Sequence, residues 1–283
     1  MVSTRSRQKS SKEEKTVEKI TEKVDSMDVD DKQSEKQNSV EQITLIDIVN
    51  HCRQIERYVA TREYRSLGRI IRELNTIRKQ LTVDILKLAI EKFVDNERCP
   101  LSKFLPSGKC NLTFPGDFNK PGYCPENDIY IHLLTVIWLF DQSKSEKSAE
   151  MLGDCIEAVN VLVTRLSEWS DRGGIDQFQA RAFFFQAQAL EHAGMSLQSC
   201  ISFWHQHIRT AILRAHTHTQ AILYNLLLRT YLEHDQYDQA DKFMHKTDFP
   251  KNADNNQWAR YYYYTGKVKV VQLEYAKFFD LLC

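Results

Sequence analysis

Glycine and proline are scarce in this chain, with nine glycines and six prolines in 283 residues. They make up about 5% of the sequence, whereas their average share in proteins is about 12%. Because these residues punctuate strands and tight turns, their shortage favours a mostly helical protein. No alternation of polar and apolar residues extends over more than a few positions, so the pattern does not indicate strands.

The chain also lacks an excess of charge and long apolar runs. Its 38 basic residues balance 38 acidic residues. Nucleic-acid-binding proteins usually carry a basic domain or stripe, so we expect no nucleic-acid partner. No run of about 18 apolar residues is present, so we expect no membrane-spanning helix. The first residues lead into a charged segment without an apolar core, which does not resemble a secretory signal.

Cysteine occurs seven times, in no Cys-x-x-Cys pair. Without a secretory signal we expect reduced thiols in the cytoplasm or nucleus. Cys99, Cys110 and Cys124 share one region, but their spacing matches no zinc site. The sequence therefore predicts no metal centre.

Motifs of catalysis and cofactor binding are missing as well. Gly266-Lys267 lacks the glycine that a phosphate-binding loop needs five residues earlier, where Tyr261 stands. Two pairs of histidines lie two positions apart, and such positions on a helix do not face each other. These pairs are His205 with His207 and His216 with His218. We therefore predict a protein that is not an enzyme and that binds no cofactor or small-molecule substrate.

Four regions follow one another along the chain. Residues 1–40 hold nine basic and nine acidic residues with few large apolar ones, so we expect a disordered charged tail. Its Arg5 to Lys9 cluster could be a nuclear localisation signal or simply solvated charge. Residues 41–98 show apolar residues at steps of three and four, which predicts helices. Five of the six prolines lie in residues 99–127, which predicts a loop because proline interrupts helices. Residues 128–283 are predicted to form helical repeats.

The helical region carries a degenerate tetratricopeptide pattern, with small residues where two helices cross and a turn residue at the bend. Two copies fit well and a third is weaker. The copies are Ala187, Leu190, Gly194, Ser199 and Phe203; Leu228, Tyr231, Asp235, Ala240 and Met244; and Ile137, Phe140, Lys144, Ala149 and Gly153. Each helical pair must stack on its neighbours to bury its apolar face. The pattern predicts an all-α, right-handed solenoid of tetratricopeptide-like pairs.

Several segments carry a resemblance to a known family. NNQWARYYYYTGKVKVVQLEY at 255–275 and QAILYNLLLRTYL at 220–232 are similar to non-ATPase regulatory subunit 3 of the 26S proteasome, a family of the regulatory-particle lid. Residues 237–242 and, more loosely, 43–48 fit the same family, so the resemblance covers about 42–276.

The resemblance implies a non-catalytic scaffold in ubiquitin-dependent degradation, with other lid subunits as partners. It singles out six positions in the last helix, each serving either repeat packing or a partner contact. They are Asn256, Trp258, Ala259, Arg260, Tyr264 and Gly266. A free adaptor that binds peptides or partner helices is the alternative from another class.

The family continues into a winged-helix PCI module, whereas this sequence stops at Cys283 inside a repeat. We therefore expect no PCI domain, and a truncated copy that does not assemble remains a third reading. We also expect Val268 and Val271 of the last helix to lack a following repeat that would cover them.

Overall fold

The computed structural model describes residues 42–94, 101–106, 124–146 and 149–272, and every regular element in these ranges is a helix. The all-α prediction is confirmed. A first helix spans residues 42–61. The other α-helices are α2 (Leu67–Ile77), α3 (Val83–Phe93), α4 (Pro125–Glu146), α5 (Ala149–Glu168), α6 (Asp176–His192), α7 (Ile201–Leu213), α8 (Thr217–Glu233), α9 (Tyr237–Lys246) and α10 (Asn255–Val271).

Short 3₁₀ helices join or precede these elements. They are η1 (Tyr64–Ser66), η2 (Arg78–Gln80), η3 (Leu101–Phe104), η4 (Gly173–Ile175) and η5 (Leu197–Cys200). Within the part of the chain that is described, no helix is long and apolar enough to cross a membrane.

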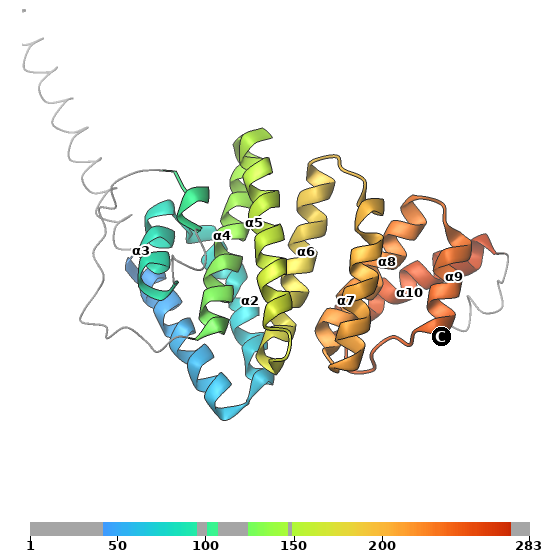
Figure 1. Cartoon of the computed structure of the whole chain (residues 1–283), viewed down its shortest axis with the longest axis horizontal. Helices are drawn as coiled ribbons and strands as arrows, with labels where there is room; N and C mark the ends of the chain where they lie inside the picture. Colours follow the sequence, from blue (N-terminus) through green and yellow to red (C-terminus); the bar gives the residue numbers. More distant parts are fainter. Residues whose placement is uncertain (1–41, 95–100, 107–123, 147–148, 273–283) are drawn as a thin grey trace, which may run out of the picture.

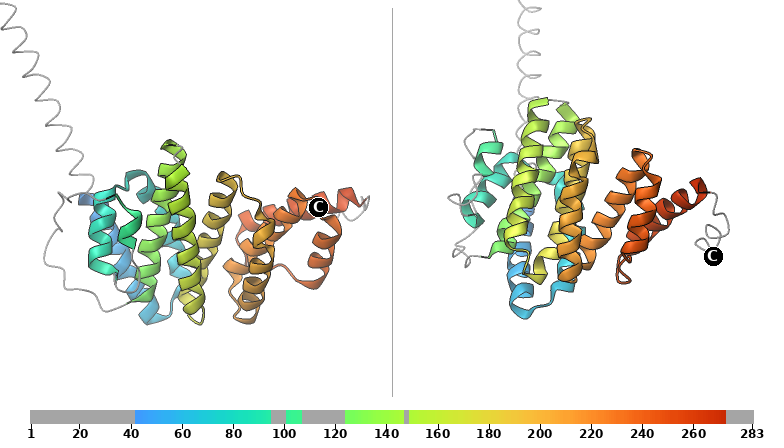
Figure 2. Two further views of the ribbon diagram at one scale, coloured as in Figure 1. Left: turned by 45° about the horizontal axis from the view of Figure 1, so that its top comes forward. Right: turned by 45° about the vertical axis from the view of Figure 1, so that its right-hand side comes forward.

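The helices from α4 onward form two layers (Figures 1 and 2). In one layer α4 contacts α6, α6 contacts α8, and α8 contacts α10. In the other, α5 packs against α4 and α6, while α7 and α9 pack against α8. Each pair thus buries its apolar stripe against the next pair, as expected for a helical-repeat stack.

The first helix and α2 form an antiparallel hairpin beside this stack. His51 Nε2 donates to Glu73 Oε2 over 2.9 Å across the hairpin, and His51 Nδ1 lies 2.9 Å from the Tyr130 hydroxyl of α4. Arg78 forms an ion pair with Asp141 of α4, and α2 also contacts α6. The N-terminal helices and the repeats therefore share one core.

Helix periodicity decides which residues enter that core. The predicted stripe of α2 is buried throughout: Leu67, Ile70, Ile71, Leu74 and Ile77. The largest fully buried side chains come from the repeats: Trp204, Tyr130, Tyr224, Phe140, Phe178 and Phe183. Because apolar residues at every third or fourth position face one side, helices such as α2 and α5 bury one stripe and expose the opposite side. The inner helices α4, α6 and α8 are buried on nearly all sides.

The predicted loop 99–127 is shorter than expected at both ends. Leu101 and Phe104 of η3 are buried, and α4 already begins at Pro125. Proline fits the first position of a helix, because its missing N–H would have no partner there and its φ is already helical. Residues 107–123 of this loop and the predicted tail 1–40 lie outside the described residues.

Four bends between helices share one backbone device. The residues with positive φ are Arg62 (58°), Gly194 (69°), Ala215 (55°) and Asp235 (55°). At each bend the amide of the next residue donates to a carbonyl five residues earlier, which satisfies a free carbonyl at the helix end. These bonds are Glu63 N to Tyr58 O (2.9 Å), Met195 N to Leu190 O (3.0 Å), His216 N to Ala211 O (2.9 Å) and Gln236 N to Tyr231 O (2.8 Å).

Candidate functional site

The two well-matched repeat copies occupy equivalent places in the structure. Gly194 follows α6 and Asp235 follows α8, and both residues adopt the left-handed backbone conformation. In both copies the amide of the next residue donates to the carbonyl five residues earlier. Ala187 and Ala240 are buried, with 2% and 0% of their surface exposed. Small side chains at these positions let neighbouring helices approach closely. Ala187 and Ala240 thus serve packing within the stack, whereas Gly194 and Asp235 form the bend between two helices.

Tyr231 adds a polar contact between α7 and α8. Its hydroxyl lies 2.6 Å from His205 Nε2, and its ring lies near Phe243 of α9. Burial raises the pKa of Tyr231, whereas burial and the charge of Arg209 lower the pKa of His205. Both groups are therefore neutral at pH 7, and the contact is a hydrogen bond rather than an ion pair.

The start of α10 is held by an aromatic cluster. The Trp258 ring lies 4.7 Å from the Phe249 ring and 5.6 Å from the Tyr261 ring, measured between centroids. Phe249 and Tyr261 stack at 4.5 Å, and the hydroxyl of Tyr224 donates to Thr247 O at 3.1 Å. Aromatic pairs in this geometry stabilise the fold by more than the burial of their apolar area alone. Trp258 is thus a packing residue.

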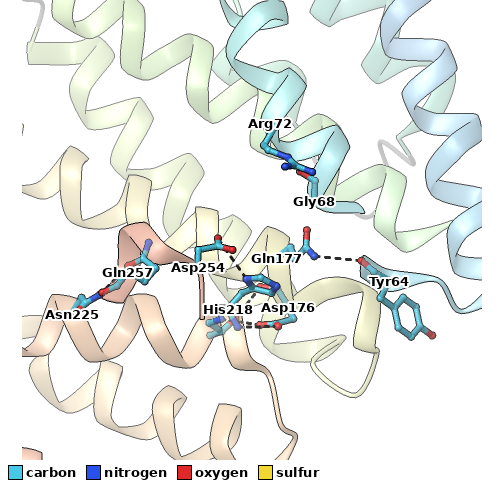
Figure 3. Close-up of polar contacts among 10 residues, drawn as sticks. Tyr64, Gly68, Arg72, Asp176, Gln177, His218, Asn225, Asp254 and Gln257 are labelled. Atoms are coloured by element: carbon cyan, nitrogen blue, oxygen red, sulfur yellow. Dashed lines mark hydrogen bonds and ion pairs between the residues drawn. The ribbon is translucent and has the colours of Figure 1, made fainter. Parts of the chain in front are cut away.

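Buried polar groups tie the helix N-termini of successive pairs together (Figure 3). The Asp176 carboxylate accepts from the backbone amides of His218 (3.1 Å) and Thr219 (2.8 Å) at the start of α8. A carboxylate is favourable there because the first amides of a helix lack partners and carry partial positive charge. Asn225 Nδ2 donates to the Gln257 backbone oxygen (3.0 Å) in the first turn of α10. These tethers set the position of each pair relative to the one before.

The six positions of α10 do not form one site. Asn256, Ala259 and Arg260 are exposed, Trp258 and Tyr264 are half-buried, and Gly266 is buried. Burial raises the pKa of Tyr264, although the positive charges of Arg229 and Arg260 oppose this. The positions on α10 are therefore divided between packing and a solvent-facing side, while Ala187, Gly194, Tyr231 and Ala240 lie on other helices.

The exposed side of α10 is partly apolar. Its exposed large residues are Tyr262 (41%), Tyr263 (65%), Val270 (38%) and Val271 (47%). Tyr263 and Val270 are seven residues apart, so helical spacing places them on one side. The spacing of seven residues in the sequence is the signal that indicates this side of the helix. Val271 is exposed as expected, whereas the expectation for Val268 is wrong: it is fully buried in the core shared with α8.

An ion pair anchors the far end of α10. Lys269 Nζ donates to Asp241 Oδ1 of α9 over 2.8 Å, and Lys269 has only 8% of its surface exposed. Partial burial by itself would raise the pKa of Asp241, but the hydrogen bond from Lys269 and its positive charge outweigh burial and lower this pKa. The described residues include no cluster of three or more His, Cys, Asp or Glu side chains able to hold a metal. The described part of the chain thus presents an array of packed helices with exposed outer surfaces.

Comparison with known proteins identifies relatives over nearly the whole chain. An Anopheles gambiae protein named "Probable 26S proteasome non-ATPase regulatory subunit 3" is 33% identical over 244 residues, which is 83% of this chain and 47% of the relative. The Dictyostelium discoideum "26S proteasome non-ATPase regulatory subunit 3" is 30% identical over 88% of this chain and 50% of its own length. The fission yeast "Probable 26S proteasome regulatory subunit rpn3" is 31% identical over 85% of this chain and 48% of its own length.

The chain thus spans about half the length of the curated relatives that it matches. The family profile described as "PSMD3-like, N-terminal TPR repeats" matches residues 39–282. This range agrees with the resemblance read from the sequence, and the stacked helical pairs are the structure that such repeats require. The chain therefore belongs to the PSMD3-like family, through the part of it that forms the N-terminal tetratricopeptide repeats.

Proposed function

We propose that this chain is a non-catalytic structural part of the 26S proteasome regulatory-particle lid and supports ubiquitin-dependent protein degradation. The observation that carries the proposal is the family match over residues 39–282, with relatives that are named non-ATPase regulatory subunits. Its partners would be other lid subunits, and its location would be the cytoplasm and the nucleus, where proteasomes work.

The fold is suited to a scaffold. Buried tethers such as Asp176 to α8 and Asn225 to α10 hold successive pairs in a fixed relation. The exposed residues Tyr263 and Val271 give α10 an apolar side of the kind that partner helices cover. A rigid stack with an apolar helix at one end can position a neighbouring subunit without any chemistry of its own.

A free tetratricopeptide-like adaptor is the second candidate. The observation that favours it is a half-buried stripe along α6, made of Gln177, Arg181, Phe184 and Gln188, on a helix whose other residues are nearly all buried. Polar and aromatic side chains of this kind can bind an extended peptide. Such an adaptor would meet varied clients rather than a fixed set of subunits.

Affinity purification of the tagged full chain, followed by mass spectrometry, separates these functions. Recovery of lid subunits in near-equal amounts supports the proposal, and recovery of chaperones or unrelated clients supports the adaptor. A chain that does not co-migrate with 26S particles in native gels contradicts the proposal and indicates a non-assembling copy.

A matched pair of variants tests the α10 surface in the same experiment. Tyr263→Ala should lower recovery of lid subunits several-fold, because it removes the most exposed aromatic side chain of α10. Leu213→Ala removes an even more exposed side chain (86%) at the end of α7 and should leave recovery unchanged. Equal recovery with both variants would exclude α10 as the contact.

A further inference from the structure

Five arginines lie along the half-buried stripe of α6, which we call the inner stripe, and we name these arginines the arginine face. They are Arg65 of η1, Arg69 and Arg72 of α2, Arg181 of α6 and Arg260 of α10. Arg65, Arg69, Arg72 and Arg260 are exposed, and Arg181 is half-buried. Arg69 and Arg72 are three residues apart, so they project from neighbouring positions on one side of α2. Arg65 lies in η1, which leads directly into α2.

Contacts place these helices against successive turns of α6. A Cβ added to Gly68 of α2 would lie 3.2 Å from Gln177 Oε1, so the two helices meet there. Arg72 lies one turn beyond Gly68 and donates its Nε to the Gly68 oxygen over 3.1 Å. Figure 3 shows Gly68, Arg72 and Gln177 at this crossing. Arg181 is the next turn of α6 after Gln177.

The third helix reaches the same stripe from the other side. The Arg260 guanidinium of α10 lies over the Phe184 ring of α6, 5.8 Å from its centroid. Phe184 is one turn beyond Arg181. Arginine side chains from α2, α6 and α10 are therefore neighbours along about two turns of α6.

The positive charge on this face is poorly neutralised. Within the described ranges, no hydrogen bond or ion pair is formed by the side chains of Arg65, Arg69 or Arg181. Burial lowers the pKa of Arg181, the charge of Asp254 opposes this, and the charge of Arg260 adds to it. Two acidic residues on the same helices are engaged with other partners: Asp176 binds the start of α8 and Glu73 binds His51.

The neutral total charge of the chain hides an opposite charge in its own N-terminal region. Residues 25–35 contain five acidic residues and one basic residue, with four of the acidic residues within seven positions. The acidic residues are Asp25, Asp28, Asp30, Asp31 and Glu35. The preceding 24 residues carry more basic than acidic groups and would be repelled by arginines.

We propose that the arginine face binds the acidic segment 25–35 of the same chain. Guanidinium groups bind carboxylates through charge-assisted, often paired hydrogen bonds, and a row of arginines matches a row of aspartates.

The chain is long enough for this contact. The His51–Glu73 hydrogen bond fixes the register of the hairpin, and residue 42 lies nine helical residues before His51, about 14 Å along the axis. Residues 32–41 between the acidic cluster and the first helix can span about 33 Å when extended. Asp28 to Asp31 can therefore reach the level of Arg69 and Arg72.

Photo-crosslinking in the full chain tests the contact. A Val29→p-benzoylphenylalanine chain should, on irradiation, form crosslinks that mass spectrometry maps to α2, α6 or α10 within the monomer band. Ser10→p-benzoylphenylalanine in the basic part of the tail is the control and should not. Crosslinks elsewhere, or only in a dimer band, would overturn the proposal in favour of another site or a second copy as occupant.

Charge variants show whether the arginines cause the contact. The combined change Arg69→Ala, Arg72→Ala and Arg260→Ala should lower the crosslink yield at least fivefold, as should 0.5 M salt. Arg57→Ala with Arg209→Ala removes two exposed arginines elsewhere and should have no effect. Arg69→Glu with Arg72→Glu should abolish crosslinks, and Asp28→Lys with Asp30→Lys should restore them. Unchanged yield in the arginine variants, or no restoration by the charge exchange, would overturn the proposal.

Discussion

Gly194 and Asp235 adopt the same left-handed backbone conformation at the same point of two consecutive repeats, with φ of 69° and 55°. Both follow the inner helix of a pair, and both precede an amide that bonds back to a carbonyl five residues earlier. The equivalence of these two residues reflects the bend inside each pair, where the backbone must turn from the inner helix to the outer one.

Gly194→Ala should destabilise the fold by about 1 kcal/mol, because a Cβ is unfavourable at positive φ. No atom lies within 4 Å of the added Cβ, so the cost comes from the backbone alone. Thermal unfolding should show a fall in Tm of about 2–4 °C. Gly153→Ala, at an exposed position in the second turn of α5, is the control and should raise stability by about 0.5–1 kcal/mol.

Ala215→Gly should have the opposite sign and stabilise the chain by up to about 1 kcal/mol. Ala215 adopts a positive φ at the bend between α7 and α8, which is unfavourable for a residue with a Cβ, and glycine removes this conformational cost. Chemical denaturation should give a higher midpoint with an unchanged slope. A lower midpoint would show that the methyl group of Ala215 contributes contacts that outweigh the backbone gain.

Asp176→Ala should cost about 1–3 kcal/mol, because two amides at the start of α8 lose their acceptor in a buried setting. Asp176→Asn keeps one acceptor oxygen and should cost less. Asp254→Ala, at a side chain that is 71% exposed, should change the free energy of unfolding by less than about 0.5 kcal/mol. Equal effects of Asp176→Ala and Asp254→Ala in denaturant titrations would contradict this account.

His132 should make stability depend on pH. Burial lowers its pKa to about 3 from an ordinary value of 6.5, and its Nε2 donates to Ala158 O at 3.0 Å. In the unfolded chain the His132 imidazole is therefore protonated below about pH 6.5, whereas in the folded chain it stays neutral down to about pH 3. The stabilisation is complete above pH 6.5 and is lost as the pH falls, by up to about 1.4 kcal/mol per pH unit.

The variant His132→Gln should flatten this dependence between pH 6.5 and 4, measured by urea unfolding at each pH. His245→Gln, at a side chain that is 69% exposed, should leave the slope as it is in the unmodified chain. A slope that survives in His132→Gln would assign the pH dependence to other histidines whose pKa is lowered by burial, such as His207 or His216.

Trp258→Ala should destabilise the chain by about 2–3 kcal/mol, because the half-buried ring contacts both Phe249 and Tyr261. Tyr263→Ala, on the exposed side of the same helix, should change stability by less than about 0.5 kcal/mol. Circular dichroism during thermal unfolding distinguishes the two. If both variants were equally destabilised, α10 would have no free side to offer a partner.

The sequence by itself determined the all-helical class, the buried stripes and the family. Apolar spacing in Leu67 to Ile77 predicts the buried side of α2 because helix geometry alone decides which residues share a face. The repeat pattern located Gly194 and Asp235 for a related reason, since a left-handed residue at a sharp bend satisfies the last carbonyls of the helix before it.

Only the tertiary structure decided how these helices meet. Burial of Val268 depends on how α10 packs against α8, and the start of α4 at Pro125 depends on a loop that composition alone extended too far. The pairing of Asp176 with α8, and the approach of Arg72 and Arg260 to one stripe of α6, join residues far apart in the chain. Periodicity reports the surroundings of one helix, whereas such contacts arise only when several helices pack together.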